Sequence, residues 1–375
     1  MTLQSYQEKA ERLFHSLALP SFQYGLGISV RPKVNMDDIL STLQQQPLDE
    51  ARITADVRVK ICKLSQCTPE FIAAHVDALV PAQESKLLAL HYASLIDATV
   101  ITIPLGIVLE KPIYINAATK SSAAVDHFII VAEKLSKATI IHIENSDSSA
   151  RFKSQVVQVY AAAQATVTFC SLQNLQQQTS LFSVKRAEVQ QEASMTWIDA
   201  QLGSKFSQLQ VQSNLVGPAA HTKALTLFCG NAQQFDLDVQ AHHTCSHTTS
   251  GLYAKGILSK DAQAIYRGKI NIEKNASQSV GHQRADTLLM DKSSRCDAIP
   301  ILDVHNNDVI SSHGTTIGQL AEEQLFYALS RGLDEEAARS MIVQGFVQPI
   351  LREIPDESLQ EQITALIAQK LPWTP

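Results

Sequence analysis

Residues 242–247, which read His-His-Thr-Cys-Ser-His, are the densest group of soft-metal ligands in this chain. On an extended strand every second side chain points to the same side. His243, Cys245 and His247 would then face one way and offer three ligands to Zn²⁺ or Fe²⁺. The alternative is a group of polar strand or turn side chains that face solvent. This alternative is favoured, because neighbours on one strand rarely complete a tetrahedral site alone.

The six cysteines are scattered along the chain and form no compact framework. The first residues do not have the pattern of an export signal, so we expect reduced thiols. Four residues separate Cys62 from Cys67, but no second pair at metal-binding spacing accompanies them, and they predict no zinc site. Cys170 and Cys229 lie in apolar runs and are predicted to be buried.

Cys296 is the cysteine that we would test first for reactivity. It follows Arg295 in a predicted polar turn, and a neighbouring cation favours the thiolate over the thiol.

His313 stands among small residues at a predicted junction between a strand-patterned core and a helix. Gly314 follows it, which permits unusual backbone geometry and the close approach of a ligand or another chain. A neutral imidazole suits Fe²⁺ or the edge of a cluster. From these residues alone, a capping or hydrogen-bonding histidine is the better interpretation.

The composition predicts a folded protein rather than a disordered one. Of the 375 residues 45% are apolar and 18% are charged, and the net charge is −6. Without a long basic run, neither a nucleic acid nor an anionic membrane surface is expected as a partner. The longest apolar stretch, 99–115, contains two prolines and three charged or glycine positions and cannot be a spanning helix. We therefore expect a cytoplasmic protein.

The hydrophobic pattern divides the chain into three regions. Residues 1–97 show helical spacing, with Thr68 before Pro69 as a helix start and a further helix over 85–95. In 98–317 the period changes to two, as in the alternating run 235–240. Helical spacing returns in 318–375, where Asp334 is predicted to cap the second of three helices.

Two observations favour a parallel β-helix over a β-sandwich for the central region. The chain contains no Asn-Gly, Asp-Gly or Gly-Gly pair, the strongest signals of tight hairpins. A small-residue motif also recurs at Ala138, Ala165 and Ala193, at intervals of about one coil of a stacked repeat. Helical ends would cover the exposed ends of such a stack.

Several blocks, in order and across most of the chain, resemble the SufB/SufD family of iron–sulfur cluster assembly proteins. They include Ile103-Pro104-Leu105-Gly106-Ile107, Tyr266-Arg267-Gly268-Lys269, Pro300-Ile301-Leu302-Asp303-Val304, Ser312-His313-Gly314, Glu322-Glu323-Gln324-Leu325-Phe326-Tyr327 and Arg331-Gly332-Leu333. The resemblance implies a right-handed parallel β-helix between helical ends. It also implies a cytoplasmic complex with a SufC-type ABC ATPase.

Two positions place the resemblance nearer the SufD branch. Val304 stands where SufB carries its scaffold cysteine, and Gly314 stands where SufB has a glutamate. His313 matches the family histidine at the SufB–SufD interface. Many SufD relatives have a cysteine two residues before that histidine, whereas this chain has Ser311.

The resemblance implies a non-catalytic SufD-like subunit that pairs with a SufB-like paralogue and holds no cofactor tightly by itself. Iron or a nascent cluster would lie transiently at the interface, with His313 as a ligand or its close neighbour. The C-terminal helices would dock the ATPase through Gln324, Phe326, Tyr327, Arg331 and Phe346.

The sequence also allows other oligomeric states and another class of function. The working form could be a homodimeric SufBD-type scaffold, and neither the sulfur donor nor flavin binding follows from the sequence. A β-helix enzyme acting on carbohydrate would need clustered acids, for which Asp236 and Asp238 on one strand face are the only start.

Overall fold

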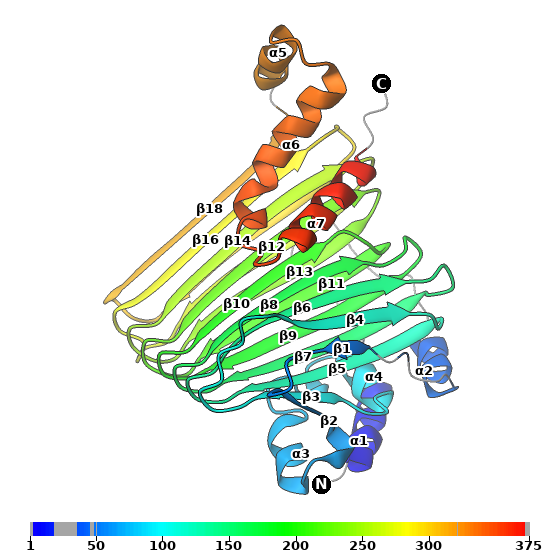
Figure 1. Ribbon diagram of the computed structural model, residues 1–375, viewed down its shortest axis with the longest axis vertical. Coiled ribbons are helices and arrows are strands. Elements are labelled where there is room, and N and C mark those ends of the chain that lie inside the picture. The colour runs from blue at the N-terminus through cyan, green and yellow to red at the C-terminus, as the bar shows by residue number, and fades with distance from the viewer. Residues whose placement is uncertain (1–2, 19–35, 46–48, 50, 321, 372–375) are drawn as a thin grey trace.

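A parallel β-solenoid of about eight turns forms the core of the computed structural model (Figure 1). The structure describes residues 3–18, 36–45, 49, 51–320 and 322–371. Each coil contributes one strand to each of two nine-stranded sheets. Sheet A contains β1 (Arg52–Thr54), β4 (Ile113–Thr119), β6 (Lys137–Ser146), β8 (Thr166–Asn174), β10 (Ser194–Gln201), β12 (His221–Asn231), β14 (Thr249–Ser259), β16 (Ser279–Leu289) and β18 (Val309–Gln319).

Sheet B lies on the opposite side of the coils. It contains β2 (Lys60–Lys63), β3 (Thr99–Ile103), β5 (Ala123–Ala132), β7 (Phe152–Ala161), β9 (Ser180–Val189), β11 (Phe206–Leu215), β13 (Gln234–His243), β15 (Gln263–Ile272) and β17 (Arg295–Val304). Strands of successive coils pair in parallel, whereas β1 and β2 pair antiparallel with β4 and β3 and cover the first edge of each sheet. The predicted parallel β-helix is confirmed.

The period-two pattern arises because one face of each strand lines the lumen. Ile140, Phe169, Trp197, Ala224 and Leu252 pair in register on five successive strands of sheet A, and all are buried in one core. Parallel in-register stacking places like positions above one another, so an apolar residue at a lumen position is buried in every coil.

The corners explain why the chain needs no Gly-based hairpins. Residues with positive φ, among them Gln164, Glu192, Ala219 and His247, recur once per coil at one corner. Their amides donate to carbonyls of the next coil, as Gln164 does to Gln191 at 2.8 Å. These inter-coil bonds offset the cost of the left-handed conformation at residues other than glycine.

The repeat suggested by the alanine motif is correct for its second interval and wrong for its first. Ala165 and Ala193 occupy the same corner position, and the strands that follow them pair Thr166 with Ser194. In the preceding coil, however, Lys137 pairs with Thr166, so Ala138 is shifted by two residues. Coil length therefore varies along the solenoid, which a fixed period cannot reproduce.

Helices cover the outer faces of both sheets. The N-terminal helices α1 (Leu3–Ser16), α2 (Met36–Gln45), α3 (Pro69–His75) and α4 (Lys86–Ala93), with the 3-10 turns η1 (Leu64–Gln66) and η2 (Ala82–Glu84), lie on the side of sheet B. The C-terminal helices are α5 (Glu322–Ser330), α6 (Glu335–Leu351) and α7 (Glu357–Lys370). Side chains of α6 and α7 share an apolar core with the outer face of sheet A.

The predicted helix starts are confirmed at three caps. Thr68 accepts from Phe71 N, Ser85 caps α4, and Asp334 accepts from Ala337 N at 2.7 Å. The N-terminal region also contains β1 and β2, which the sequence did not predict. None of the helices that the structure describes combines the length and hydropathy that crossing a bilayer requires.

Candidate functional site at the open end of the solenoid

The last coil, formed by β17 and β18, leaves one end of the solenoid uncovered. Each of these strands pairs only with the preceding coil among the described residues, so each presents a free backbone edge. Every residue of β18 is exposed or half-buried. Ile310 is 63% exposed, and Ile301, Val304 and Ile317 are exposed beside it. A free strand edge with exposed apolar side chains is the kind of surface that binds another chain.

His313 lies in the middle of β18 and points to the lumen side of its strand. It pairs in register with Gln283 of β16, which is buried and whose side-chain amide donates to the Ile301 carbonyl at 3.1 Å. Within the described residues no further coil stacks on His313, and its imidazole is exposed. On the other face of the strand, Ser312 Oγ and His282 Nδ1 lie 2.7 Å apart and share a hydrogen bond.

The predicted position of His313 was wrong, and the backbone freedom that Gly314 permits is not used. The histidine is not at the strand-to-helix junction, because β18 continues to Gln319 and α5 begins only at Glu322. Gly314 does not have a left-handed backbone, and a Cβ built on it would meet nothing within 4 Å. The glycine instead leaves open space beside the imidazole.

Helix α5 projects beyond the solenoid and presents most of the predicted docking residues (Figure 1). Phe326 is 72% and Tyr327 60% exposed, and Gln324 is exposed on the same helix. The Arg331 guanidinium lies 5.0 Å from the Tyr327 ring centroid. Phe346 differs, because it is half-buried against the outer core of sheet A and the Lys255 ammonium lies 4.4 Å from its ring centroid.

The candidate ligand set in 242–247 does not assemble, because β13 ends at His243 and the chain then turns. His243 is buried and shares hydrogen bonds with Thr248 and Ser250, both at 2.7 Å. His247 occupies the corner with φ 60°, and the Cys245 thiol donates to the Val216 carbonyl at 3.0 Å. The three side chains therefore do not converge.

The predicted position of Cys296 in a polar turn is wrong, and its surroundings argue against a reactive thiol. The residue is the second of β17, and its side chain is buried in the lumen, with Sγ 3.4 Å from Thr287 Oγ1. Burial raises the pKa of its thiol to about 11, while Arg295 forms an ion pair with Asp297. Cys170 and Cys229 are buried, as predicted, under the C-terminal helices.

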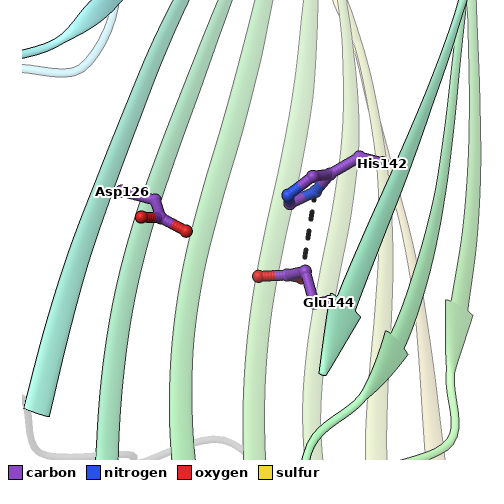
Figure 2. A group of neighbouring side chains, drawn as sticks. All are labelled: Asp126, His142 and Glu144. Atoms are coloured by element: carbon purple, nitrogen blue, oxygen red, sulfur yellow. Dashed lines mark ion pairs between the residues drawn. The ribbon is translucent and has the colours of Figure 1, made fainter. Parts of the chain in front are cut away.

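A buried charged cluster in the early coils was missed at the sequence level. Figure 2 shows Asp126 of β5 and His142 and Glu144 of β6 inside the solenoid. Each offers one ligand atom, and these atoms lie within 4.8 Å of one another; no other such group of three occurs in the described parts of the chain. His142 and Glu144 share one face of β6, but Asp126 lies on β5, and no sequence spacing connects it to them.

Lys153 of β7 already occupies the cation position of this cluster. Its ammonium lies 2.7 Å from Asp126 and 3.5 Å from Glu144. Burial alone would lower the pKa of Lys153, but the two carboxylates outweigh it and raise that pKa. Burial, with nearby lysines, lowers the pKa of His142 well below 6.5, so its imidazole is neutral. A divalent ion would have to displace the ammonium, and the geometry favours an internal ion pair over a metal site.

The neighbouring coils extend this polar part of the lumen. Lys185 of β9 and Asp199 of β10 form a second buried ion pair, and Ser171 donates to Asp199 at 2.6 Å. The lumen therefore holds an apolar stack and, beside it, two groups of buried charges: Lys153 with two carboxylates, and Lys185 with Asp199. Buried charges of this kind need partners of opposite sign.

Comparison with known protein families matches residues 114–346, more than half of the chain, to the family described as "SUF system FeS cluster assembly, SufBD core domain". The chain belongs to the SufBD family. Its relatives include the iron–sulfur cluster assembly SufBD family proteins SERP0500 of Staphylococcus epidermidis and SH2035 of Staphylococcus haemolyticus, each 26% identical over 357 residues. SAR0880 of Staphylococcus aureus is 27% identical. In all three, the match covers 93% of this chain and 76% of the relative.

A second buried polar group of this SufBD protein joins the N-terminal helices to sheet B. His91 of α4 shares hydrogen bonds with Ser154 at 2.9 Å and with His127 of β5 at 3.1 Å. Gln158 lies 2.9 Å from the other nitrogen of His127 and donates to the Val76 carbonyl. Burial lowers the pKa of His127 to about 3 and that of His91 well below 6.5.

Removing the buried cation should strongly destabilise the solenoid. Lys153→Met would leave Asp126 and Glu144 buried without a counter-charge, which costs about 3–5 kcal/mol in the free energy of unfolding. The control is Lys223→Met, since Lys223 pairs with Glu353 at the surface and such pairs contribute about 1 kcal/mol or less. Urea unfolding of both variants measures the difference. Equal losses would contradict a structural role for the lumen pair.

Acid should destabilise the protein through its buried neutral histidines. The unfolded chain takes up a proton at each histidine near pH 6.5, while folded His127 does so only near pH 3. Each such histidine therefore lowers the free energy of unfolding only below about pH 6.5, by roughly 2 kcal/mol when the pH reaches 5. His127→Gln should flatten this dependence in urea unfolding at pH 5 and pH 7. His221→Gln, at an exposed histidine, is the matched control.

Proposed function

We propose that this SufBD-family chain is a SufD-like, non-catalytic subunit of an iron–sulfur cluster assembly complex. It pairs with a SufB-like paralogue and docks a SufC-like ABC ATPase in the cytoplasm. The observation that carries the proposal is the uncovered last coil, where a free strand edge, exposed apolar side chains and His313 occur together.

The last coil supports pairing with a protein of the same architecture. A partner strand can add to the free edge of β18 through backbone hydrogen bonds, and the exposed Ile310 and Ile317 supply apolar contact area. A second solenoid with a similar open end has the matching surface, so two related chains can cover each other's ends.

His313 is the residue that we assign to iron or a nascent cluster, as a ligand or the close neighbour of one. An exposed imidazole beside Gly314 can reach an atom held between the two chains. Ser311 lies two residues away on the same face of β18 and supplies a hydroxyl instead of a thiolate. Most of the soft ligands would then come from the partner, which agrees with a chain that holds no cluster tightly by itself.

Two residues near the open end favour the SufD branch over SufB. Val304, the last residue of β17, is apolar and exposed where a scaffold cysteine would be needed. Gly314 has no carboxylate to offer.

The ATPase is assigned to α5 and the region around it. This helix contacts α6 and exposes two adjacent aromatic rings, Phe326 and Tyr327, which are typical anchors of protein interfaces. Gln324 and Arg331 supply polar contacts around these rings, and Phe346 fixes α6 to the solenoid rather than facing a partner.

The alternative of a carbohydrate-acting enzyme has little in its favour. Asp236 is buried in an ion pair with Arg267, and the Arg267 side chain also approaches Asp238 at 3.9 Å. Asp236 is therefore poorly suited to protonate a leaving group or attack a sugar, and Asp238 alone does not supply the pair of acids that glycoside hydrolysis requires.

Co-expression of the tagged chain with untagged SufB-like and SufC-like partners tests the assignment. We expect a stable complex with both, its stoichiometry given by light scattering. Changing Phe326 and Tyr327 together to Ala should weaken capture of the ATPase by about 30-fold or more and leave the SufB-like partner bound. Met341→Ala, at an exposed position of α6, is the control. A homodimer that does not bind the SufB-like chain would support a SufBD-type homodimeric scaffold instead. A monomer that binds neither partner would overturn the proposal.

The role of His313 is tested within that complex. His313→Ala should leave assembly intact and lower the amount of cluster formed by roughly tenfold, since an essential ligand or its neighbour is lost. His221→Ala, an exposed histidine on β12 far from the last coil, is the matched control. Iron and sulfide content and the visible absorption of the cluster provide the measurement. An unchanged yield would remove His313 from the site.

A further inference from the structure

Cys62 and Cys67 form a close pair of thiols at the covered end of the solenoid. Their Sγ atoms lie 3.7 Å apart, and both side chains are half-buried against the N-terminal helical layer. Cys62 belongs to β2, the strand that covers the first edge of sheet B, and Cys67 directly precedes Thr68, the cap of α3. Neither residue has a part in the function proposed above.

The turn between the two cysteines is held in place by the core. Leu64 of η1 is fully buried, and its amide donates to the Ala98 carbonyl at 2.8 Å. Asp97 accepts from the Ser65 amide at 3.1 Å and from the Ser65 hydroxyl at 2.6 Å. Because the turn is anchored at both of its first residues, the two sulfur atoms are kept close without any rearrangement.

A metal is a poor occupant for this pair. Two thiolates need further ligands to complete a tetrahedral zinc site. Within the parts of the chain that the structure describes, the only close group of three His, Cys, Asp or Glu side chains lies in the lumen and contains no cysteine. A disulfide, in contrast, forms when the distance between the two sulfur atoms shortens from 3.7 Å to about 2 Å. It needs no further ligand from the protein.

We propose that Cys62 and Cys67 are a reversible oxidation site at which a hydroperoxide converts the two thiols into a disulfide. Cys62, as thiolate, attacks a peroxide oxygen, so that an S–O bond forms, the O–O bond breaks and the leaving oxygen takes up a proton. The sulfur of Cys67 then loses its proton and attacks the Cys62 sulfur. An S–S bond forms, the S–O bond breaks and water leaves. Two thiols lose two electrons in total, and the peroxide gains them.

The order of the two steps follows from the surroundings of Cys67. The Cys67 thiol donates to the Lys63 carbonyl at 3.7 Å, and burial, followed by the neighbouring Cys62 thiol, raises the pKa of Cys67. Cys67 is therefore protonated at neutral pH and is better suited to resolve an oxidised Cys62 than to attack peroxide.

The disulfide would fasten the cover of the first sheet edge. It would tie β2, which pairs with β3 through Cys62 and Val100, to the residue before the cap of α3. The closed loop is short, so the expected effect is local: slower amide exchange in β2 and α3 rather than a large change in global stability.

Peroxide treatment of the purified full-length chain, followed by acid quench and peptide mass spectrometry, tests the proposal. We expect a Cys62–Cys67 disulfide to form at least tenfold faster than any oxidation of the other four cysteines, and dithiothreitol to reverse it. Buried Cys170, Cys229 and Cys296 serve as internal controls for intact folding. Amide exchange before and after oxidation should change in β2 and α3. Retention of both thiols while Cys245 is oxidised would overturn the proposal.

Single variants separate a paired site from two independent thiols. In Cys67→Ser, oxidation should stop at a sulfenic acid on Cys62, which dimedone traps, whereas Cys62→Ser should react slowly at pH 7. Circular dichroism should show that both variants fold. Equal dimedone labelling of wild type and Cys67→Ser would mean that Cys67 resolves nothing, and would contradict the mechanism. The test needs neither partner nor cluster, so its result does not depend on the assembly role.

Discussion

Hydrogen bonding between successive coils is the constraint on which this structure depends. Each strand of the two sheets satisfies its backbone groups on neighbouring coils, and even the corners donate from one coil to the next. A coil in the middle of the stack is therefore satisfied on both sides, and a coil at an end on only one. The first end is closed by the antiparallel strands β1 and β2. The last end has no equivalent cover among the described residues, and its free edge makes it the natural place for a partner.

The same stacking explains how charged residues are tolerated inside the solenoid. Lys153, Asp126 and Glu144 come from three strands of two adjacent coils, and only the native register brings them together. A shift of one residue would turn Lys153 to the outer face and leave two carboxylates in the lumen. A buried ion pair is a weak source of stability, because desolvation offsets most of its attraction. Its contribution here is better understood as a penalty on wrong registers, which an apolar stack alone would not impose.

The sequence predicted most of what depends on local pattern. Alternation predicted the strands, the missing hairpin pairs favoured parallel coils, and Thr68 and Asp334 marked helix starts that the structure confirms. What it could not predict depends on three-dimensional proximity or on where a strand ends. In the lumen cluster, no sequence spacing connects Asp126 of β5 to His142 and Glu144 of β6. His243, Cys245 and His247 do not form a ligand set, because the chain turns a corner after His243. The sequence pattern placed Cys296 in a turn, whereas its side chain faces the lumen from β17.

The position of His313 shows how the repeat itself can create an accessible site. In any inner coil a lumen-side residue is covered by the coil above, as Gln283 is covered in β16. His313 occupies the equivalent register position in β18 and is exposed only because the stack stops there. A side chain at this position is held by a regular strand, yet it faces any chain that covers the last coil. Such a residue can be positioned with the rigidity of a core and still share a ligand with a second chain. Under the proposed function this combination would suit a ligand shared between two subunits, and it arises from ending the solenoid rather than from any special local motif.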